Sequence, residues 1–201
     1  MKQPLVIAMT GASGAPYAVR LLEVLLNSAI PVHLTISPAG AQVIEQEMNL
    51  SIDLEDFNPR QLVGDTNADS LIYHNYRDYF TPIASGSFRT GGMVVTPCSG
   101  STLSGIAVGA SSNLIQRAAD VHLKERRKLI LVTRETPLSL VHIENMKKVT
   151  EAGAVVLPAM PGWYHGVESM DDLINFVVSR ILDQLEIEND LIARWASREG
   201  I

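Results

Sequence analysis

The stretch that decides the fold is Leu5-Val6-Ile7-Ala8-Met9-Thr10-Gly11-Ala12-Ser13-Gly14-Ala15, where an apolar run enters a glycine-rich turn ahead of a leucine-rich segment. A short apolar run bounded by glycine is typical of a strand buried on both faces of a parallel sheet. Gly11 and Gly14 allow torsions and close approaches that a Cβ would prevent, and Ser13 is a candidate cap for the next helix. Because a helix N-terminus presents unpaired N–H groups, this turn predicts a site for a phosphate or an electron-rich ring.

Helical and strand patterns alternate along the rest of the chain. We expect helices after Pro16, from Ser37 to about Met48, after Asn113, and over 139–151 and 170–185, with strands over 31–36, 93–96, 129–133 and 154–157. Residues 51–88 show little of either pattern, and long loops of this kind are usually functional or contact a partner. The alternation predicts an α/β fold with a doubly wound, mostly parallel sheet and helices on both faces, formed by a single domain over 1–201.

Composition narrows the function classes. Hydrophobic residues make up 46% of the 201 residues and charged residues only 19%, which hints at surface buried in an oligomer. A net charge of -6 argues against a general nucleic-acid binder. One cysteine, Cys98, allows no intrachain disulfide and favours a reducing cytoplasm. We expect no membrane span and no signal peptide, because no apolar run approaches about 20 residues and the first strand follows Met1-Lys2-Gln3-Pro4 directly.

Further candidate site residues follow other predicted strands. Pro97-Cys98-Ser99-Gly100-Ser101-Thr102 is a second glycine-serine turn, and Ser37 follows the second strand. Arg134-Glu135 follows the strand over 129–133, where a buried charged pair would be costly without a purpose. Because ligands of open α/β sheets bind outside the carboxyl ends of the strands, these residues are expected to share one crevice.

Other reactive side chains allow two interpretations each. Arg117 and Lys124 lie seven residues apart and so project from one helix face, which fits either an anion site or an ordinary solvated surface. Cys98 is either a nucleophile or, as we favour, an inert buried thiol, because no base lies near it in sequence. The five histidines lack metal-ligand spacing, so no metal site is predicted.

Several stretches together resemble the UbiX/Pad flavin prenyltransferases. They are Gly11-Ala12-Ser13-Gly14-Ala15, Pro97-Cys98-Ser99, Thr102-Leu103-Ser104, Arg117-Ala118-Ala119-Asp120-Val121, Leu123-Lys124-Glu125-Arg126-Arg127, Arg134-Glu135-Thr136-Pro137 and Tyr164-His165. The likeness runs in order from about Leu5 to Trp195, and the Lys-Glu-Arg-Arg block followed by a strand and Arg-Glu-Thr-Pro is the most specific part. The resemblance implies a flavodoxin-like fold, shared with a wider flavoprotein group that includes the cysteine-type decarboxylases.

The same resemblance implies a transfer reaction. The dimethylallyl group of dimethylallyl monophosphate would move to N5 of reduced FMN, and ring closure at C6 would give prenylated FMN. That product would serve a partner decarboxylase of the UbiD type, for example in ubiquinone biosynthesis. The resemblance also implies a metal-independent enzyme and a homo-oligomer, usually a dodecamer.

Residue roles are implied position by position. FMN would be held by Gly11, Ala12, Ser13, Ser37, Ser99, Gly100, Ser101, Thr102 and Arg134, and the donor phosphate by Arg117, Lys124, Tyr164 and Arg180. Fixed cations stabilise the charge that develops on a leaving phosphate, so Lys124 also counts as catalytic.

Proton transfer is implied for Glu47 and Glu135 with Ser13. Glu47 also has a plain alternative as a solvent-facing residue in the run Glu45-Gln46-Glu47. Trp195 would place an aromatic face near an allylic cation. Tyr79 and Pro38 depart from a tryptophan and a lysine found in some members of the family.

Two other functions remain open. An FMN-dependent cysteine-type decarboxylase would use the same scaffold, but those enzymes carry an active-site histidine and a Pro-x-Met-Asn segment, and this chain has Pro158-Ala159-Met160-Pro161. A non-catalytic flavin-binding module would bind flavin and form no product.

Overall fold

The apolar run at the start of the chain forms the strand β1 (Leu5–Met9), in which every residue is buried. In the computed structural model, which describes residues 2–65 and 68–194, β1 pairs in parallel with β2 (Val32–Ile36) on one side and with β4 (Gly92–Cys98) on the other. Strands β3 (Leu71–Tyr73), β5 (Leu129–Thr133) and β6 (Val155–Val156) complete a six-stranded parallel sheet in the order β3-β2-β1-β4-β5-β6. The α/β, flavodoxin-like sheet expected from the sequence is confirmed.

The strand order reverses between β1 and β4, since the chain builds outward from β1 to β3 and then returns to place β4 on the other side. In open α/β sheets such a reversal leaves a crevice outside the carboxyl ends of the strands. The two glycine-serine turns of the sequence follow these two strands, so the topology places both at the crevice.

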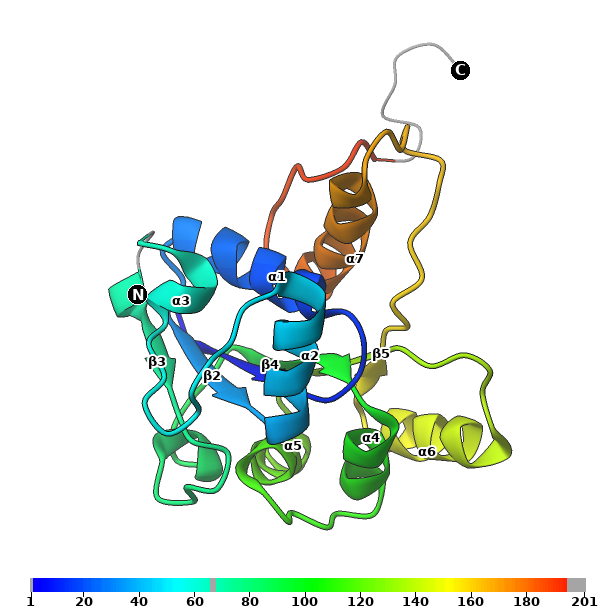
Figure 1. The fold of residues 1–201 in the computed structure, drawn as a ribbon. Helices are drawn as coiled ribbons and strands as arrows, with labels where there is room; N and C mark the ends of the chain where they lie inside the picture. Colours follow the sequence, from blue (N-terminus) through cyan, green and yellow to red (C-terminus); the bar gives the residue numbers. More distant parts are fainter. Residues whose placement is uncertain (1, 66–67, 195–201) are drawn as a thin grey trace.

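Helices cover both faces of the sheet (Figure 1). One face packs against α1 (Ala15–Asn27), α2 (Pro38–Met48) and α7 (Met170–Gln184), and the other against α4 (Gly100–Ala107), α5 (Leu114–Lys124) and α6 (Leu140–Glu151). Alternate residues of β1 explain the two layers: Ile7 belongs to the first hydrophobic cluster and Val6 to the second. The apolar stripe predicted for α7 is buried at Val177, Val178, Ile181 and Leu182.

The segment over 51–88 has more structure than its sequence pattern indicates. It contains α3 (Arg60–Val63), the 3-10 turns η1 (Ala68–Ser70) and η2 (Pro82–Ala84), and the edge strand β3. Strand β3 escaped sequence analysis because it is three residues long and has only one neighbour, so Leu71 is buried while Ile72 is 49% exposed. Across residues 2–65 and 68–194, no helix is both long and apolar enough to cross a membrane.

Candidate functional site

The first turn packs tightly against the start of α2. A Cβ added to Gly11 would lie 2.5 Å from the Cβ of Ala39. Gly14 has φ 129°, a torsion that residues with a Cβ rarely adopt, and a Cβ there would lie 2.9 Å from the ring of Tyr17. Both glycines are therefore required by the shape of the turn. The expectation that Ser13 caps α1 is wrong, because the N-cap residue is Gly14 and no side chain of the turn takes that role.

The cap of α1 comes instead from α2. The Glu47 carboxylate accepts hydrogen bonds from the backbone N–H of Gly14 at 2.9 Å and of Ala15 at 2.9 Å. A carboxylate at this position satisfies N–H groups that have no partner within the helix and complements the positive end of the helix dipole. Glu47 is exposed to solvent, as the surface interpretation expects, but its carboxylate is bonded to the first turn, beside Ser13.

Serine side chains begin two further helices at the same edge of the sheet. Ser37 Oγ accepts from Gly40 N at 3.0 Å and begins α2. Ser99 Oγ accepts from Thr102 N at 3.3 Å and begins α4, and its hydroxyl donates to Thr102 Oγ1 at 3.0 Å. Ser101 Oγ lies 3.1 Å from Ser99 Oγ. The N-termini of α1, α2 and α4 therefore meet at one edge, with hydroxyl groups among them, which suits a phosphate-bearing ligand.

Arg134 joins the end of β5 to this edge. Its Nε donates to the backbone oxygen of Ser13 at 3.3 Å, across 121 residues of sequence. Glu135 follows it, is exposed, and accepts from Thr136 N at 3.2 Å. It lines a small pocket of about 60 Å³ with Thr133, Met146 and Met160. The charged pair at the end of β5 is thus exposed at the same crevice as the first turn.

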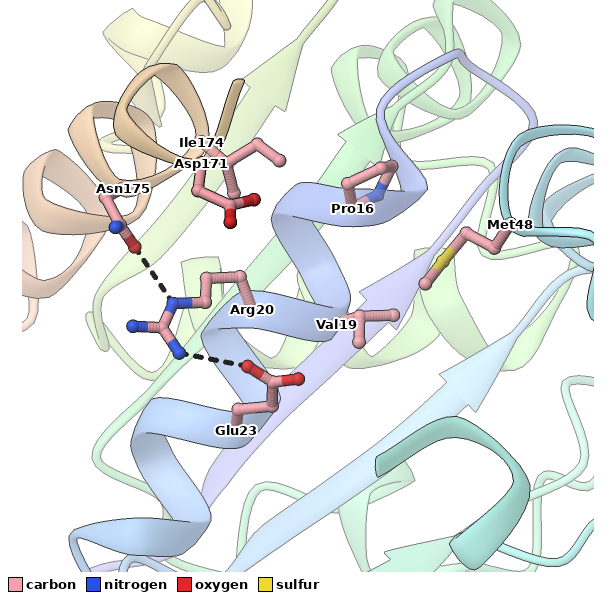
Figure 2. Close-up of a pocket in the computed structure, with 8 residues that line it drawn as sticks. All are labelled: Pro16, Val19, Arg20, Glu23, Met48, Asp171, Ile174 and Asn175. Atoms are coloured by element: carbon pink, nitrogen blue, oxygen red, sulfur yellow. Dashed lines mark hydrogen bonds and ion pairs between the residues drawn. The ribbon is translucent and has the colours of Figure 1, made fainter. Parts of the chain in front are cut away.

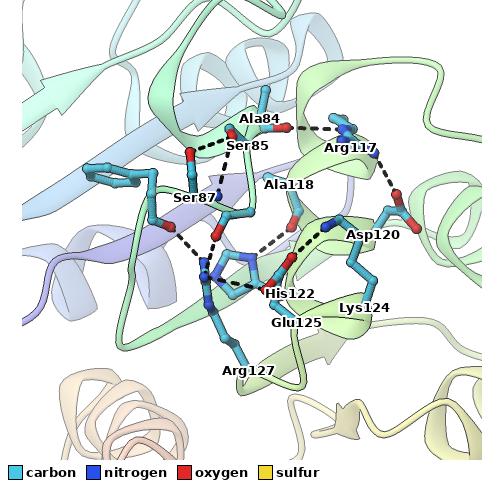
Figure 3. Close-up of polar contacts among 12 residues, drawn as sticks. Ala84, Ser85, Ser87, Arg117, Ala118, Asp120, His122, Lys124, Glu125 and Arg127 are labelled. Atoms are coloured by element: carbon cyan, nitrogen blue, oxygen red, sulfur yellow. Dashed lines mark hydrogen bonds and ion pairs between the residues drawn. The ribbon is translucent and has the colours of Figure 1, made fainter.

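Arg117 and Lys124 lie together on α5, as their spacing predicts, but they face a different segment (Figure 3). Arg117 Nε donates to Ala84 O at 3.1 Å, and its guanidinium pairs with Asp120 at 2.8 Å. Lys124 pairs with Glu125 and borders Gly86. Arg127 holds the same segment through Gly86 O at 2.6 Å and Phe88 O at 2.7 Å.

Lys124 lies away from the crevice within one chain. Helix α5 ends at Lys124, shortly before β5 begins at Leu129, and Leu129 pairs with Met93 near the start of β4. Lys124 is therefore near the amino ends of the strands, whereas Ser13 and Arg134 follow the carboxyl ends. The structure does not bring Lys124 to Ser13 within a single subunit.

Tyr164 and Arg180 form a third group on one side of α7. The ring of Tyr164 lies 5.8 Å from that of Phe176, and Phe176 is one helical turn from Arg180. The Arg180 guanidinium pairs with Asp183 at 2.8 Å, and Arg194 binds the same carboxylate at 2.7 Å. Hydrogen bonds and charge from Arg194 hold the pKa of Asp183 below its usual range. Trp195, the last residue implied by the resemblance, lies outside the described residues.

A larger pocket of about 400 Å³ lies between α1 and α7 (Figure 2). Its polar side chains include Arg20, which donates to Asn175 at 2.9 Å and pairs with Glu23 at 3.0 Å. None of the predicted site residues lines it. Because Arg20 is already paired, this pocket does not offer the cationic surface that a phosphate requires.

Sequence analysis missed two residues at the crevice, Thr10 and Tyr17. Burial raises the pKa of Tyr17, with Arg134 acting in the opposite sense and Glu47 raising it further, so its phenol lies within range of both charges. Thr10 is 1% exposed and joins the two turns. No sequence pattern marks either residue, because a threonine after an apolar run and a tyrosine in a helix are common.

Cys98 is buried, and burial raises the pKa of its thiol to about 12, which agrees with the inert thiol that we favour from sequence. Across 2–65 and 68–194, no group of three histidine, cysteine, aspartate or glutamate side chains is placed to hold a metal ion.

Comparison with known proteins identifies the family. Residues 1–182 match the Flavoprotein family. A flavin prenyltransferase UbiX from Alkalihalophilus pseudofirmus is 50% identical over 189 residues, covering 94% of each chain, and one from Pseudomonas aeruginosa is 45% identical over 195 residues, covering 96% of this chain and 93% of the relative. The chain belongs to the UbiX family of flavoproteins. The resemblance stated from sequence is confirmed.

Solved structures of UbiX relatives share the whole fold. A UbiX crystal structure in complex with FMN and dimethylallyl pyrophosphate is 39% identical with a TM-score of 0.88, covering 99% of this chain and 100% of its own. A dodecameric FMN-dependent UbiX-like decarboxylase from Escherichia coli is 42% identical with a TM-score of 0.86, covering 98% and 100%. A PPC decarboxylase shares the fold alone, at 13% identity and a TM-score of 0.60.

Proposed function

We propose that this chain is a flavin prenyltransferase that moves the dimethylallyl group of dimethylallyl monophosphate to N5 and C6 of reduced FMN. The observation that carries the proposal is the convergence of three helix N-termini, two glycine-serine turns and Arg134 at the switch point of the sheet. The UbiX relative crystallised with FMN and dimethylallyl pyrophosphate supports FMN and a phosphorylated dimethylallyl compound as the two ligands. The prenylated flavin would then serve a UbiD-type decarboxylase.

The residues of the crevice fit FMN. Gly11, Ala12 and Ser13 would offer the first turn, with Ser37 beside it, and Ser99, Gly100, Ser101 and Thr102 would offer hydroxyl and backbone N–H groups to phosphate and ring oxygens. Arg134 would add a positive charge. Reduced FMN, when bound, supplies the nucleophilic N5, and the protein positions it against the donor and excludes water.

Proton transfer would fall to Glu47, Glu135 and the Ser13 hydroxyl. Glu47 already accepts N–H groups of the first turn, and Glu135 is exposed at the same crevice. Each carboxylate oxygen has more than one acceptor site, so both side chains can accept a proton beside their present hydrogen bonds. Trp195 would face the prenyl group.

The donor phosphate would be held by Arg117, Lys124, Tyr164 and Arg180. Because a single subunit does not bring Lys124 to the crevice, and Tyr164 and Arg180 form a separate group beside α7, we propose that neighbouring subunits supply these residues in a homo-oligomer. The dodecameric UbiX-like relative supports an assembly of this kind. Loss of the allylic C–O bond places negative charge on the phosphate, and fixed cations stabilise that charge without reorganising.

We also propose that the enzyme works in the cytoplasm as a single domain over 1–201, with no metal ion. The single cysteine and the requirement for reduced FMN both fit a reducing compartment.

Mass spectrometry of the flavin tests the proposed function. The protein is incubated anaerobically with reduced FMN and dimethylallyl monophosphate, and the flavin is expected to gain one dimethylallyl group. A parallel reaction with dimethylallyl diphosphate tests which donor is used. A flavin of unchanged mass with both donors would reject the prenyltransferase and leave a non-catalytic flavin-binding module.

A decarboxylase is the second candidate, because two relatives at 42% and 40% identity are described as an FMN-dependent UbiX-like decarboxylase and a phenylacrylic acid decarboxylase. The same protein is incubated with oxidised FMN and phenylacrylic acid or a C-terminal cysteinyl peptide, and carbon dioxide is measured. Release of carbon dioxide without any partner protein would favour this candidate.

A further inference from the structure

The two turns of the crevice are joined by one side chain. Thr10 is the residue between β1 and Gly11, and it is 1% exposed. Its hydroxyl donates to Pro97 O at 2.7 Å and accepts from Ser99 N at 2.8 Å. Its own backbone N–H also donates to Pro97 O, at 3.2 Å. The hydroxyl therefore acts both as a donor and as an acceptor, and its two partners, Pro97 and Ser99, lie on either side of Cys98.

These bonds join the two segments just beyond the paired residues of β1 and β4. The register between β1 and β4 runs as far as Ala8 opposite Val95. Beyond it, Pro97 has no N–H to donate, and the pairing of β4 with β5 shifts between Val95 and Cys98. Beyond Val95 the backbone N–H of Thr10 still donates to Pro97 O, and the Thr10 hydroxyl adds a second bond to Pro97 O and a bond from Ser99 N.

The link reaches the start of α4. Ser99 is the N-cap residue of that helix, and its Oγ accepts from Thr102 N. Thr10 holds the Ser99 backbone, Ser99 holds Thr102, and the residues over 99–102 are the second flavin turn of the proposed function. On the other side Thr10 is joined directly to Gly11, which begins the first turn. Thr10 thus joins the two turns through its hydroxyl, and its hydroxyl is the group that reaches the backbone of Ser99.

We propose that Thr10 is a positioning residue for the flavin, whose hydroxyl sets the distance between the turns over 11–14 and 99–102 without touching the ligand. The inference rests on the proposed flavin site and names a residue that determines its affinity. A small displacement of either turn moves several flavin contacts at once, so the loss of one buried hydroxyl has a large effect on binding.

Three other buried threonines at the sheet differ from Thr10, because their hydroxyls make no hydrogen bond to a neighbouring segment in the described part of the chain. Thr35 on β2, Thr96 on β4 and Thr133 on β5 are all buried, and within the described part of the chain their Oγ1 atoms have no hydrogen-bond partner. Thr35 lies opposite Ala8 in the neighbouring strand, two residues before Thr10, and it is as fully buried as Thr10. Its replacement by valine removes the same chemical group without breaking a bond, which makes it a matched control.

The test compares Thr10→Val, Thr10→Ser and Thr35→Val in the full chain. FMN affinity is measured by quenching of flavin fluorescence, at a temperature where circular dichroism shows each variant to be folded. Thr10→Val is expected to raise the dissociation constant for FMN about tenfold to a hundredfold, because two hydrogen bonds are lost and Ser99 N is left without its acceptor. Thr10→Ser and Thr35→Val are expected to bind FMN as the wild type does.

Steady-state kinetics separate positioning from general damage. Thr10→Val is expected to raise KM for reduced FMN while KM for the prenyl donor stays the same, because the donor phosphate is held by other residues. Wild-type FMN affinity in Thr10→Val would overturn the inference. Where Thr10→Val does not fold, Thr10→Ser decides: a tenfold loss of FMN affinity with serine shows that the hydroxyl is not the feature that matters.

The outcome for Thr10 can be separated from the outcome for the proposed function. A wild-type chain that binds FMN but forms no prenylated flavin would refute the prenyltransferase alone, and the titrations would still decide the role of Thr10. A wild-type chain that does not bind FMN would refute both.

Discussion

Glu47 belongs to α2 but caps α1, since its carboxylate accepts the N–H groups of Gly14 and Ala15. The sequence shows only a glutamate in a charged run, and the family resemblance implies proton transfer. The structure adds that the carboxylate is part of the first turn, so Glu47 has a structural role beside the proposed role in proton transfer. The two roles are expected to respond differently to substitution.

Replacing Glu47 separates the two roles. Glu47→Gln keeps an oxygen that can accept from Gly14 and Ala15, and a glutamine cannot exchange the proton. We expect Glu47→Gln to lower kcat about a hundredfold to ten-thousandfold, with little change in the free energy of unfolding. Glu47→Ala is expected to cost about 1 kcal/mol of that free energy in addition. Urea unfolding and single-turnover assays measure the two effects, and a fully active Glu47→Gln would leave the carboxylate as a helix cap only.

Cys98 provides a second test at the residue scale. Burial raises the pKa of its thiol to about 12, so the nucleophilic thiolate is scarce at neutral pH. We expect Cys98→Ala to retain the prenyl transfer rate of the wild type, with at most a loss of stability from the smaller side chain. A fall in kcat of several orders of magnitude, without loss of flavin binding, would show that the thiol takes part in a covalent step.

Strands β2 and β3 are joined by a buried pair of histidines. His33 on β2 and His74 just after β3 lie with Nδ1 and Nε2 2.7 Å apart, and the ring of Phe88 meets His33 edge-on at 5.0 Å between centroids. One ring must donate and the other accept, so the pair is held together in its neutral form. Burial and the neighbouring His33 lower the pKa of His74 to about 4, although Asp78 acts in the opposite sense, and burial also lowers the pKa of His33.

This pair predicts a loss of stability in acid. The folded-state pKa lies below the ordinary value of about 6.5, so the unfolded chain takes up the proton first as the pH falls. The contribution of His74 to stability is complete above pH 6.5 and is lost toward pH 4, by at most about 1.4 kcal/mol per pH unit. Urea unfolding at several pH values measures the slope.

The matched variant for this slope is His74→Phe, which removes one titrating ring. Between pH 6.5 and 4, the slope of the free energy of unfolding against pH is expected to fall by the contribution of one proton. Part of the slope is expected to remain, because the pKa of buried His122 is also lowered. An unchanged slope in His74→Phe would assign the acid sensitivity to other groups.

At the scale of the whole molecule, the proposed site exists in three parts. The turns proposed for flavin lie at the carboxyl edge of the sheet, Lys124 lies at the end of α5 toward the other edge, and Tyr164 and Arg180 border α7. A single subunit would supply the flavin turns in the proposed function. The proposed assembly would bring α5 and α7 of neighbouring subunits to the crevice.

Ligand titrations test this division of labour. Lys124→Ala and Arg180→Ala are each expected to weaken binding of the prenyl donor by about tenfold or more, because a charged contact to phosphate is lost, and to leave FMN affinity nearly unchanged. Lys147→Ala on α6 is the control, since Lys147 forms only a long surface pair with Glu151 at 4.0 Å. Equal loss of both ligands would contradict the assignment of these cations to the donor.

Mixed oligomers test whether the cations come from different subunits. When Lys124→Ala and Arg180→Ala subunits are dissociated, mixed and reassembled, part of the transfer activity is expected to return, because some sites receive the intact residue from each variant. If the activity of the mixture stays at the level of the separate variants, one subunit supplies both Lys124 and Arg180 to each site.

The sequence by itself was enough to predict most of the fold. The run Leu5–Met9 and the caps Ser37, Asn113 and Ser139 are local signals, and the structure confirms the elements that they mark. The short edge strand β3 was missed because a three-residue strand is stabilised by its neighbour more than by its own pattern. The positions of the two glycine-serine turns were predicted correctly, because glycine and serine at the end of a buried strand are local features.

Only the tertiary structure decided which distant residues meet. Glu47 reaches the start of α1, Arg134 reaches Ser13, and Thr10 ties Pro97 and Ser99 together, each across a separation in sequence that no spacing rule covers. It also decided that Lys124 is remote from these residues within one chain. Helix caps and strand patterns depend on neighbouring residues and can be read along the chain, whereas side-chain contacts between elements depend on how the sheet orders its strands.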